Sequence, residues 1–281
     1  MKKIYLSPPH LEKYEKEYIL DALKSNWIAP LGPYVNNFEK RLSQYIGVKH
    51  CLCVNSGTSA IHLALKVLGI KKNDIVLCQN FTFVGSVSPV TYCNATPILI
   101  GSEEESWNIS PEILRKTIID LIKQKRKPKA IIVVHLYGMP AKMSEIKSIA
   151  KKYKIPIIED AAEALGSSIN GKKCGSFGDI GILSFNGNKI ITSSGGGAIL
   201  SNNKNYIKSA KHLATQAKDD FIYYHHSVIG YNYRMSNILA AIGLGQMKSL
   251  SKKIETRRKI FEEYYNYFKK NLNIQFLNEY L

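Results

Sequence analysis

Cysteine pairs and long apolar runs are both missing from this 281-residue sequence. Its five cysteines are odd in number and none forms a C-x-x-C pair, which disfavours a disulfide framework or a zinc ribbon. No apolar run approaches the roughly 18–20 residues that cross a bilayer, and the first residues lack the apolar core of a signal peptide. These absences predict a reduced, cytoplasmic protein with no membrane partner and no metal site.

Acidic residues are also few relative to basic ones. The chain has 22 Asp and Glu against 39 Lys and Arg, a formal net charge of +17. Such an excess could mark a nucleic-acid surface, but the lysines are spread along the chain, and the densest cluster lies at residues 123–129. We expect a solvated basic surface that favours an anionic small substrate, with nucleic-acid binding as the alternative from another class of function.

Short apolar runs alternate with stretches of helical spacing. Buried strands are expected at residues 75–77, 97–100, 130–134, 155–158, 181–184 and 197–200. Helices are expected at residues 59–68, 86–92, 111–123, 143–153, 206–216, 236–250 and 252–272. This alternation predicts an α/β domain over residues 1–250, with an N-terminal helical arm, a mainly parallel sheet and a ligand site at the carboxyl ends of the strands.

Two strand ends carry residues of complementary chemistry. The apolar run 155–158 is followed by Glu159 and Asp160, and Lys189 follows a later strand in the run Ser184-Phe-Asn-Gly-Asn-Lys189. Taken singly, the Asp could cap a turn and the Lys could be solvated. Together they are the pair that pyridoxal phosphate requires, because the cofactor needs a lysine for its imine and an acid beside its pyridine nitrogen.

The same cofactor needs a phosphate site and a ring face. Residues 54–60 read as a strand, a turn at Gly57 and a helix start, so backbone N–H groups and the hydroxyls of Thr58 and Ser59 could hold a phosphate. A plain capped helix is the alternative. Phe81 follows a strand and could stack on the pyridine ring or fill the core. The order of these motifs along the chain favours a pyridoxal-phosphate site.

The motifs resemble those of the DegT–StrS sugar aminotransferases in type and order, over essentially the whole chain from Leu6 onward. The matching runs are Asn55-Ser-Gly-Thr-Ser-Ala60, Val134-His-Leu-Tyr-Gly138, Ile158-Glu-Asp-Ala-Ala-Glu-Ala164, Ser184-Phe-Asn-Gly-Asn-Lys189, Gly195-Gly-Gly197 and Gly230-Tyr-Asn-Tyr-Arg234. The resemblance implies a fold-type I pyridoxal-phosphate enzyme that aminates a nucleotide-linked keto-sugar. Three runs favour the bacillosamine-type branch, which makes UDP-4-amino-4,6-dideoxy-N-acetylglucosamine: Ser7-Pro-Pro-His10, Ile28-Ala-Pro-Leu-Gly32 and Asn186-Gly-Asn-Lys-Ile-Ile-Thr192.

The resemblance also implies roles for individual residues. Lys189 would form the Schiff base and shuttle the proton, and Asp160 would pair with the pyridinium nitrogen. Phe81 would stack on the ring, and Glu163, where many relatives have Gln, would face the ring hydroxyl. The remaining cofactor contacts would come from Gly57, Thr58, Ser59, Ser184 and, from the neighbouring subunit of a homodimer, Asn232.

Three further residues are candidate substrate contacts: Asn188, His135 and Arg234. His135 follows a strand and could line the site, but a hydrogen-bonded structural histidine is favoured. Arg234 could either contact the substrate's diphosphate or hold its own loop.

The implied reaction transfers the amino group of L-glutamate to the C4 ketone of a UDP-4-keto-6-deoxy-N-acetylhexosamine, with C3 amination left open. Family members continue beyond the long helix at 252–272 into a small α/β domain. Residues 251–281 are therefore expected to form this helix and the beginning of a truncated C-terminal domain. Two hypotheses remain for a chain with such a truncated domain. It is an active sugar aminotransferase, or it is a fragment that binds the cofactor but is inactive.

Overall fold

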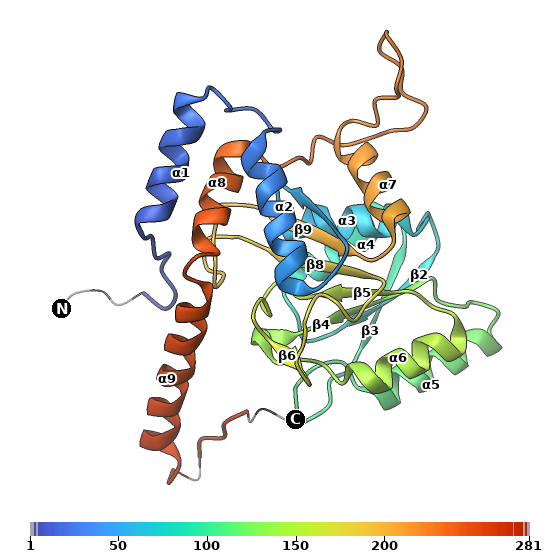
Figure 1. The fold of residues 1–281 in the computed structure, drawn as a ribbon. Coiled ribbons are helices and arrows are strands. Elements are labelled where there is room, and N and C mark those ends of the chain that lie inside the picture. The colour runs from blue at the N-terminus through green and yellow to red at the C-terminus, as the bar shows by residue number, and fades with distance from the viewer. Residues whose placement is uncertain (1–2, 4, 272, 278, 280–281) are drawn as a thin grey trace.

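The computed structural model describes residues 3, 5–271, 273–277 and 279. A seven-stranded sheet lies at its centre, in the order β1-β9-β8-β5-β4-β2-β3 (Figure 1). The strands are β1 (His50–Val54), β2 (Ile75–Gln79), β3 (Thr96–Ile100), β4 (Ala130–Val134), β5 (Ile157–Asp160), β8 (Ile180–Ser184) and β9 (Gly197–Ser201). Within this sheet β9 is antiparallel to both of its neighbours, and the pairs from β8 to β3 are parallel. The expected mainly parallel α/β fold is confirmed.

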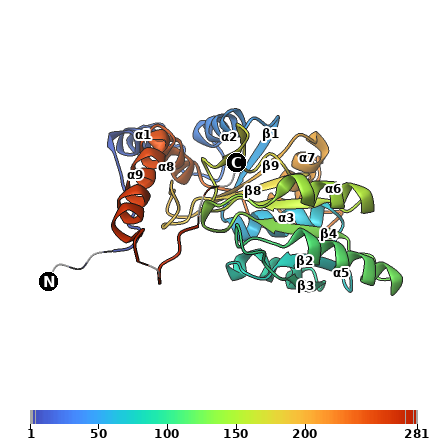
Figure 2. The same cartoon turned by 90° about the horizontal axis from the view of Figure 1, so that it is seen from below.

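Helices cover both faces of the sheet (Figures 1 and 2). Ile158 and Ile182 pack toward α3 (Gly57–Val67), α4 (Ser88–Tyr92) and α7 (Lys204–Ala214). Val133 and Ile157 pack on the other face toward α5 (Pro111–Lys123) and α6 (Met143–Tyr153). The side chains of successive strand residues point to opposite faces, so neighbours in one strand join different cores.

Local capping explains where the helices begin. At α5, Ser110 Oγ accepts the N–H of Ile113 and Pro111 occupies the first turn, so the bounds predicted for this helix hold. At α3, Ser56 is the N-cap and its Oγ accepts the N–H of Ser59 at 3.0 Å. The helix therefore starts at Gly57, two residues before the prediction. The segment predicted as one helix at 86–92 is divided into the 3₁₀ turn η1 (Val84–Ser86) and α4.

The predicted strand at 155–158 is displaced by two residues. In β5, Ile157 pairs with Ile131 of β4, and Asp160 pairs with Val134 of β4 and Ile182 of β8. Asp160 is thus inside the sheet, as its last residue, and does not follow it. The Asn170-Gly171 turn of the hairpin β6 (Ser168–Ile169) and β7 (Lys172–Lys173) was not predicted, although both turn residues have the positive φ typical of such turns.

Of the four remaining helices, one packs on the face of the sheet through Phe38 and Leu42, which share a core with Leu183 and Leu200, and three lie to the side of it (Figure 1). They are α1 (Lys13–Lys24), α2 (Pro33–Ile46), α8 (Asn237–Gln246) and α9 (Leu250–Phe268). The helix predicted at 236–250 ends early, and the predicted end of the long helix, Leu272, lies outside the described residues. The domain boundary at residue 250 stays a prediction. No helix among the described residues is long and apolar enough to cross a membrane.

Candidate active site

Asp160 ends β5 and is almost fully buried. Ser86 Oγ donates to its Oδ2 at 2.7 Å, and the Ala162 N–H donates to its Oδ1 at 3.1 Å. Burial raises the pKa of Asp160, although these two hydrogen bonds and the nearby charge of Lys189 act in the opposite direction. A buried carboxylate in this setting is stabilised by a protonated nitrogen placed against it.

Lys189 lies in the loop between β8 and β9, close enough to influence the ionisation of Asp160. Its Nζ lies 3.1 Å from Glu163 Oε1, and both side chains are mostly buried. The other oxygen of Glu163 accepts the N–H of Tyr137 at 2.8 Å. The structure therefore brings Lys189, Asp160 and Glu163 into one neighbourhood at the carboxyl ends of β4, β5 and β8.

The turn from β1 into α3 forms an anion cradle. The first N–H groups of a helix have no intrahelical partner, and those of Gly57 and Thr58 stand at this end. A side chain at Gly57 would lie 3.1 Å from Ser184 Cβ, and one at Gly197 would come within 2.6 Å of the Ser56 and Gly57 backbone. Only glycine allows β8 and β9 to approach the turn this closely. Ser184 therefore lies beside the helix start, as a phosphate ligand would require.

Phe81 and Asn232 lie at the surface of this region. Phe81 follows β2 and is 47% exposed, which argues against the core alternative raised for it. The side chain of Asn232 is exposed, while its carbonyl accepts Nδ2 of Asn55 from the same chain at 3.3 Å. Its contact with a neighbouring subunit stays a prediction.

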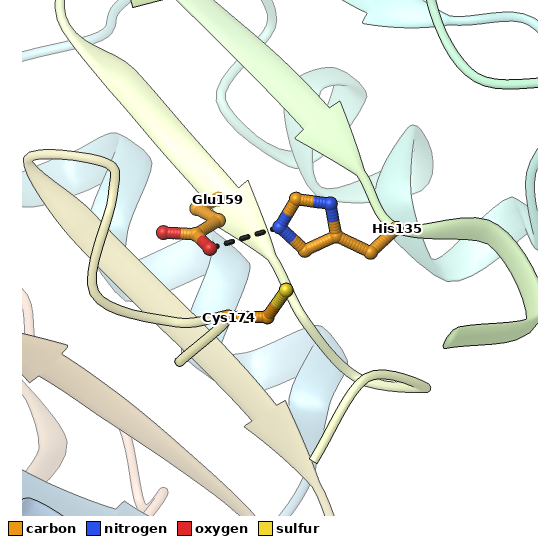
Figure 3. Close-up of side chains that lie close together, drawn as sticks. All are labelled: His135, Glu159 and Cys174. Carbon is orange, nitrogen blue, oxygen red and sulfur yellow. Dashed lines mark hydrogen bonds and ion pairs between the residues drawn. The ribbon is translucent and has the colours of Figure 1, made fainter. Parts of the chain in front are cut away.

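A second, buried cluster is formed by His135, Glu159 and Cys174 (Figure 3). His135 Nδ1 accepts the Ala141 N–H at 3.0 Å, so the ring proton lies on Nε2, which donates to Glu159 Oε1 at 2.8 Å. Glu159 also accepts three backbone N–H groups, from Gly175, Phe177 and Gly178, at 2.5–2.8 Å. Burial favours the neutral acid, but His135 and the amides of Gly178 and Gly175 outweigh it and lower the pKa of Glu159.

This buried cluster also bears on metal binding. The ligand atoms of His135, Glu159 and Cys174 lie within 4.8 Å of one another. The lone pairs that a cation would need on the histidine and the carboxylate are already engaged by hydrogen bonds. The cluster is therefore a clamp that joins β4, β5 and the 175–178 loop, and not a suitable metal centre.

Two of the candidate substrate contacts, His135 and Arg234, are held by hydrogen bonds within the protein. His135 is fully buried and both of its ring nitrogens are hydrogen-bonded, so it is the structural histidine favoured by the sequence. Arg234 donates to Glu39 Oε1 and to the Cys53 carbonyl, each at 3.1 Å, which ties its segment to β1. Neither side chain is available to a substrate in this geometry, because each is held by a carboxylate. Asn188 is exposed, and its carbonyl accepts Ser7 Oγ.

Several residues of the site carry no local sequence signal. Ser86 reaches Asp160 from 74 positions away, and Tyr137 binds Glu163 through its backbone at a positive φ of 51°. Gln79 and Asn108 are buried amides that join the loops after β2, β3 and β4. Of these residues, only Tyr137 belongs to one of the motifs that resemble the DegT–StrS family.

The chain is similar in sequence and fold to known aminotransferases. The profile of the DegT/DnrJ/EryC1/StrS aminotransferase family matches residues 9–279. A solved structure, "Crystal structure of a DegT DnrJ EryC1 StrS aminotransferase from Brucella abortus", superposes with a TM-score of 0.88 at 32% identity, covering 92% of this chain and 69% of that one.

Three relatives extend the comparison. "Putative pyridoxal phosphate-dependent aminotransferase EpsN" of Bacillus subtilis (strain 168) is 50% identical over 99% of this chain and 72% of its own length. GDP-perosamine synthase of Escherichia coli O157:H7 is 41% identical over 97% and 72%. UDP-4-amino-4,6-dideoxy-N-acetyl-beta-L-altrosamine transaminase of Campylobacter jejuni (serotype O:23/36, strain 81-176) is 38% identical over 95% and 70%.

The fold and the donor set define a fold-type I enzyme that depends on pyridoxal phosphate. An acid inside the sheet, a lysine beside it and an anion cradle at a helix start are the groups that this cofactor needs. The chain belongs to the DegT/DnrJ/EryC1/StrS aminotransferase family. It is accordingly a pyridoxal-phosphate-dependent sugar aminotransferase.

Proposed function

We propose that this enzyme transfers the amino group of L-glutamate to the C4 ketone of a UDP-4-keto-6-deoxy-N-acetylhexosamine, as a cytoplasmic homodimer. The chemistry rests above all on one observation: Lys189 Nζ lies 3.1 Å from Glu163 Oε1, at the edge of the sheet where the buried Asp160 ends β5. The sugar rests on the transaminase of Campylobacter jejuni, whose name specifies a UDP-linked 4-amino-4,6-dideoxy sugar.

In this proposal the cofactor is held at three places. The N–H groups of Gly57 and Thr58 and the hydroxyls of Thr58, Ser59 and Ser184 would hold its phosphate, joined by Asn232 of a second subunit. Asp160 would keep the ring nitrogen protonated, Glu163 would face the ring hydroxyl, and Phe81 would lie on the ring face. When bound, pyridoxal phosphate carries the amino group between the two substrates and delocalises the electrons released at the reacting carbon.

Lys189 would move the proton. Its Nζ would take a proton from the α-carbon of the amino donor and deliver one to C4 of the sugar. The contact with Glu163 would keep the ammonium close to the position of both carbons while substrates exchange. Because the Lys189 and Glu163 side chains are largely shielded from water, the proton is protected from loss to solvent.

A second acceptor is favoured by the 41% identity to a GDP-perosamine synthase, which specifies a GDP-linked sugar. The two candidates differ in the nucleotide and share the amination chemistry. One assay can therefore distinguish them.

The test supplies the cofactor-loaded protein with ¹⁵N-glutamate and either the UDP-linked or the GDP-linked 4-keto-6-deoxy sugar. We expect ¹⁵N in the UDP-linked product, at C4 by NMR, and none with Lys189→Ala. Transfer only to the GDP-linked sugar would overturn the proposed substrate and keep the chemistry. If a protein that binds pyridoxal phosphate releases no 2-oxoglutarate with either acceptor, the proposed function is wrong.

A further inference from the structure

Trp107 occupies an unusual backbone conformation beside the candidate site. Its φ is 61°, in the left-handed region that bulky residues rarely adopt. The side chain is 40% exposed, so the conformation does not serve to bury the indole in the core. Strained residues of this kind persist only where the surroundings impose them, and they gather at functional sites.

The turn before Trp107 imposes this conformation. Glu103 accepts the N–H groups of Glu105 and Ser106, each at 2.9 Å, and the Ser106 hydroxyl. Lys142 lies 3.3 Å from Glu103 and 2.5 Å from Glu105. The backbone closes the turn, since Trp107 N donates to the Glu103 carbonyl and Glu103 N donates to the Asn108 carbonyl.

Two buried amides connect this turn to Phe81. Gln79 Nε2 donates to the Phe81 carbonyl at 2.8 Å and to Asn108 Oδ1 at 3.1 Å, and its Oε1 accepts the Ile109 N–H at 3.0 Å. Asn108 Nδ2 in turn donates to the Met139 carbonyl at 2.8 Å. The backbones that carry Phe81 and Trp107 are therefore fixed relative to each other by a buried hydrogen-bond network.

The two rings meet at the end of this network. Their centroids are 6.3 Å apart, with 30° between the ring planes. This is an offset stack, which favours one orientation of each ring. Phe81 is thus supported by Trp107, while 47% of its surface remains open.

We propose that Trp107 is a positioning residue that holds the ring of Phe81 in the orientation needed to cover the cofactor. The inference rests on the proposed function, in which Phe81 lies on the face of pyridoxal phosphate. The locked turn keeps the indole in place, so Phe81 loses less freedom when the cofactor binds. Trp107 acts through Phe81 and need not contact the cofactor.

The test measures pyridoxal-phosphate binding to the 281-residue protein freed of cofactor, by absorbance titration. Loss of the aromatic contact in Trp107→Ala should weaken binding roughly 2- to 10-fold, and Trp107→Phe should restore it. Trp107→Gly keeps the turn free of strain and removes the ring, so it should bind as weakly as Trp107→Ala. It also replaces that variant should Trp107→Ala fail to fold.

The chain offers a matched control, because Trp27 is its other tryptophan and is similarly exposed. Trp27→Phe should leave the affinity unchanged. In that protein the tryptophan emission, excited selectively over that of the 17 tyrosines, comes from Trp107 alone. This emission should fall as the cofactor binds and should give the same dissociation constant as the absorbance titration.

Two results would overturn the inference: unchanged affinity in Trp107→Gly, or equal losses in Trp107→Phe and Trp107→Gly. A loss of thermal stability without a change in affinity would mean a purely structural role and would also overturn it. The affinity is measured without turnover. A failed amination assay would therefore contradict the proposed function without affecting the test of Trp107.

Discussion

Replacing Glu159 with glutamine would exchange one carboxylate oxygen of the buried clamp in Figure 3 for an amide nitrogen. Oε1 now accepts from His135 and Gly175, and Oε2 accepts from Phe177 and Gly178. Whichever oxygen is replaced, the new NH₂ group faces two donors. The side chain is completely buried, so water cannot take over these contacts.

The magnitude follows from this count. A hydrogen bond to a charged group contributes about 1.5–3 kcal/mol, so two lost bonds correspond to about 3–6 kcal/mol. Removing the buried charge recovers part of its desolvation cost. We expect a net loss of about 3–5 kcal/mol, as for other broken buried pairs, in a protein whose total stability is of the order of 5–15 kcal/mol.

Urea unfolding followed by circular dichroism measures this loss. With a urea dependence of about 3 kcal/mol per molar, the midpoint should fall by roughly 1–1.7 M at pH 7. The pKa of Glu159 is lowered in the folded state, so its stabilisation is present above the ordinary value of 4.5 and is lost as the pH falls through the lower folded value. The difference in urea midpoint between the wild type and the variant should therefore narrow as the pH falls below 4.5.

Glu262→Gln provides the control, because Glu262 is exposed on α9 and its replacement should change stability by no more than about 0.5 kcal/mol. Equal midpoints for Glu159→Gln and the wild type at pH 7 would refute the clamp. A gap that stays constant down to pH 3 would refute the role given to its charge.

Three further predictions concern the site and the thiols. Lys189→Ala should fold normally but lose the absorbance band of the lysine imine, since the covalent attachment is lost; an imine band that persists in the variant would contradict the role of this lysine. Asp160→Asn should lower the rate of amination by about 10²-fold or more while the urea midpoint changes little, and a near-wild-type rate would show that the ring nitrogen has no need of this acid. Burial raises the pKa of Cys78 to about 12, so a thiol reagent at pH 8 should label the half-buried Cys51 first and Cys78 only after unfolding; mass spectrometry of the labelled peptides would show the order.

The sequence was sufficient where local signals decide the structure. The bounds of α5 and α6 were predicted correctly, because Ser110-Pro111 marks one start and a regular apolar spacing marks both helices. Strand β4 was also predicted without error, because it is a continuous apolar run buried on both faces. The chemical logic of Asp160 and Lys189 needed only strand ends and residue types, and both residues lie at the same edge of the sheet.

Tertiary contacts decided the rest. The two-residue displacement of β5 arises from its register with β4 and β8, and pairing with non-adjacent segments is not contained in a local apolar pattern. The contact of Ser86 with Asp160, the engagement of Arg234 by Glu39 and the left-handed Trp107 all depend on partners far along the chain or on a closed turn. Residue type alone made Arg234 resemble a phosphate ligand, whereas its surroundings give it a structural role.

The doublet Glu159-Asp160 shows how one strand can serve both stability and chemistry. Adjacent strand residues point to opposite faces, so Glu159 turns to His135 and the 175–178 loop, while Asp160 turns to Ser86 and the side of Lys189. The β4 and β8 pairings hold the backbone that the two side chains share. Glu159→Gln should therefore lower the urea midpoint and largely preserve the amination rate of the folded fraction. Asp160→Asn should lower the amination rate and largely preserve the urea midpoint. If both variants lost stability and rate in equal proportion, the division between the two carboxylates would be wrong, and the doublet would act as a single electrostatic unit.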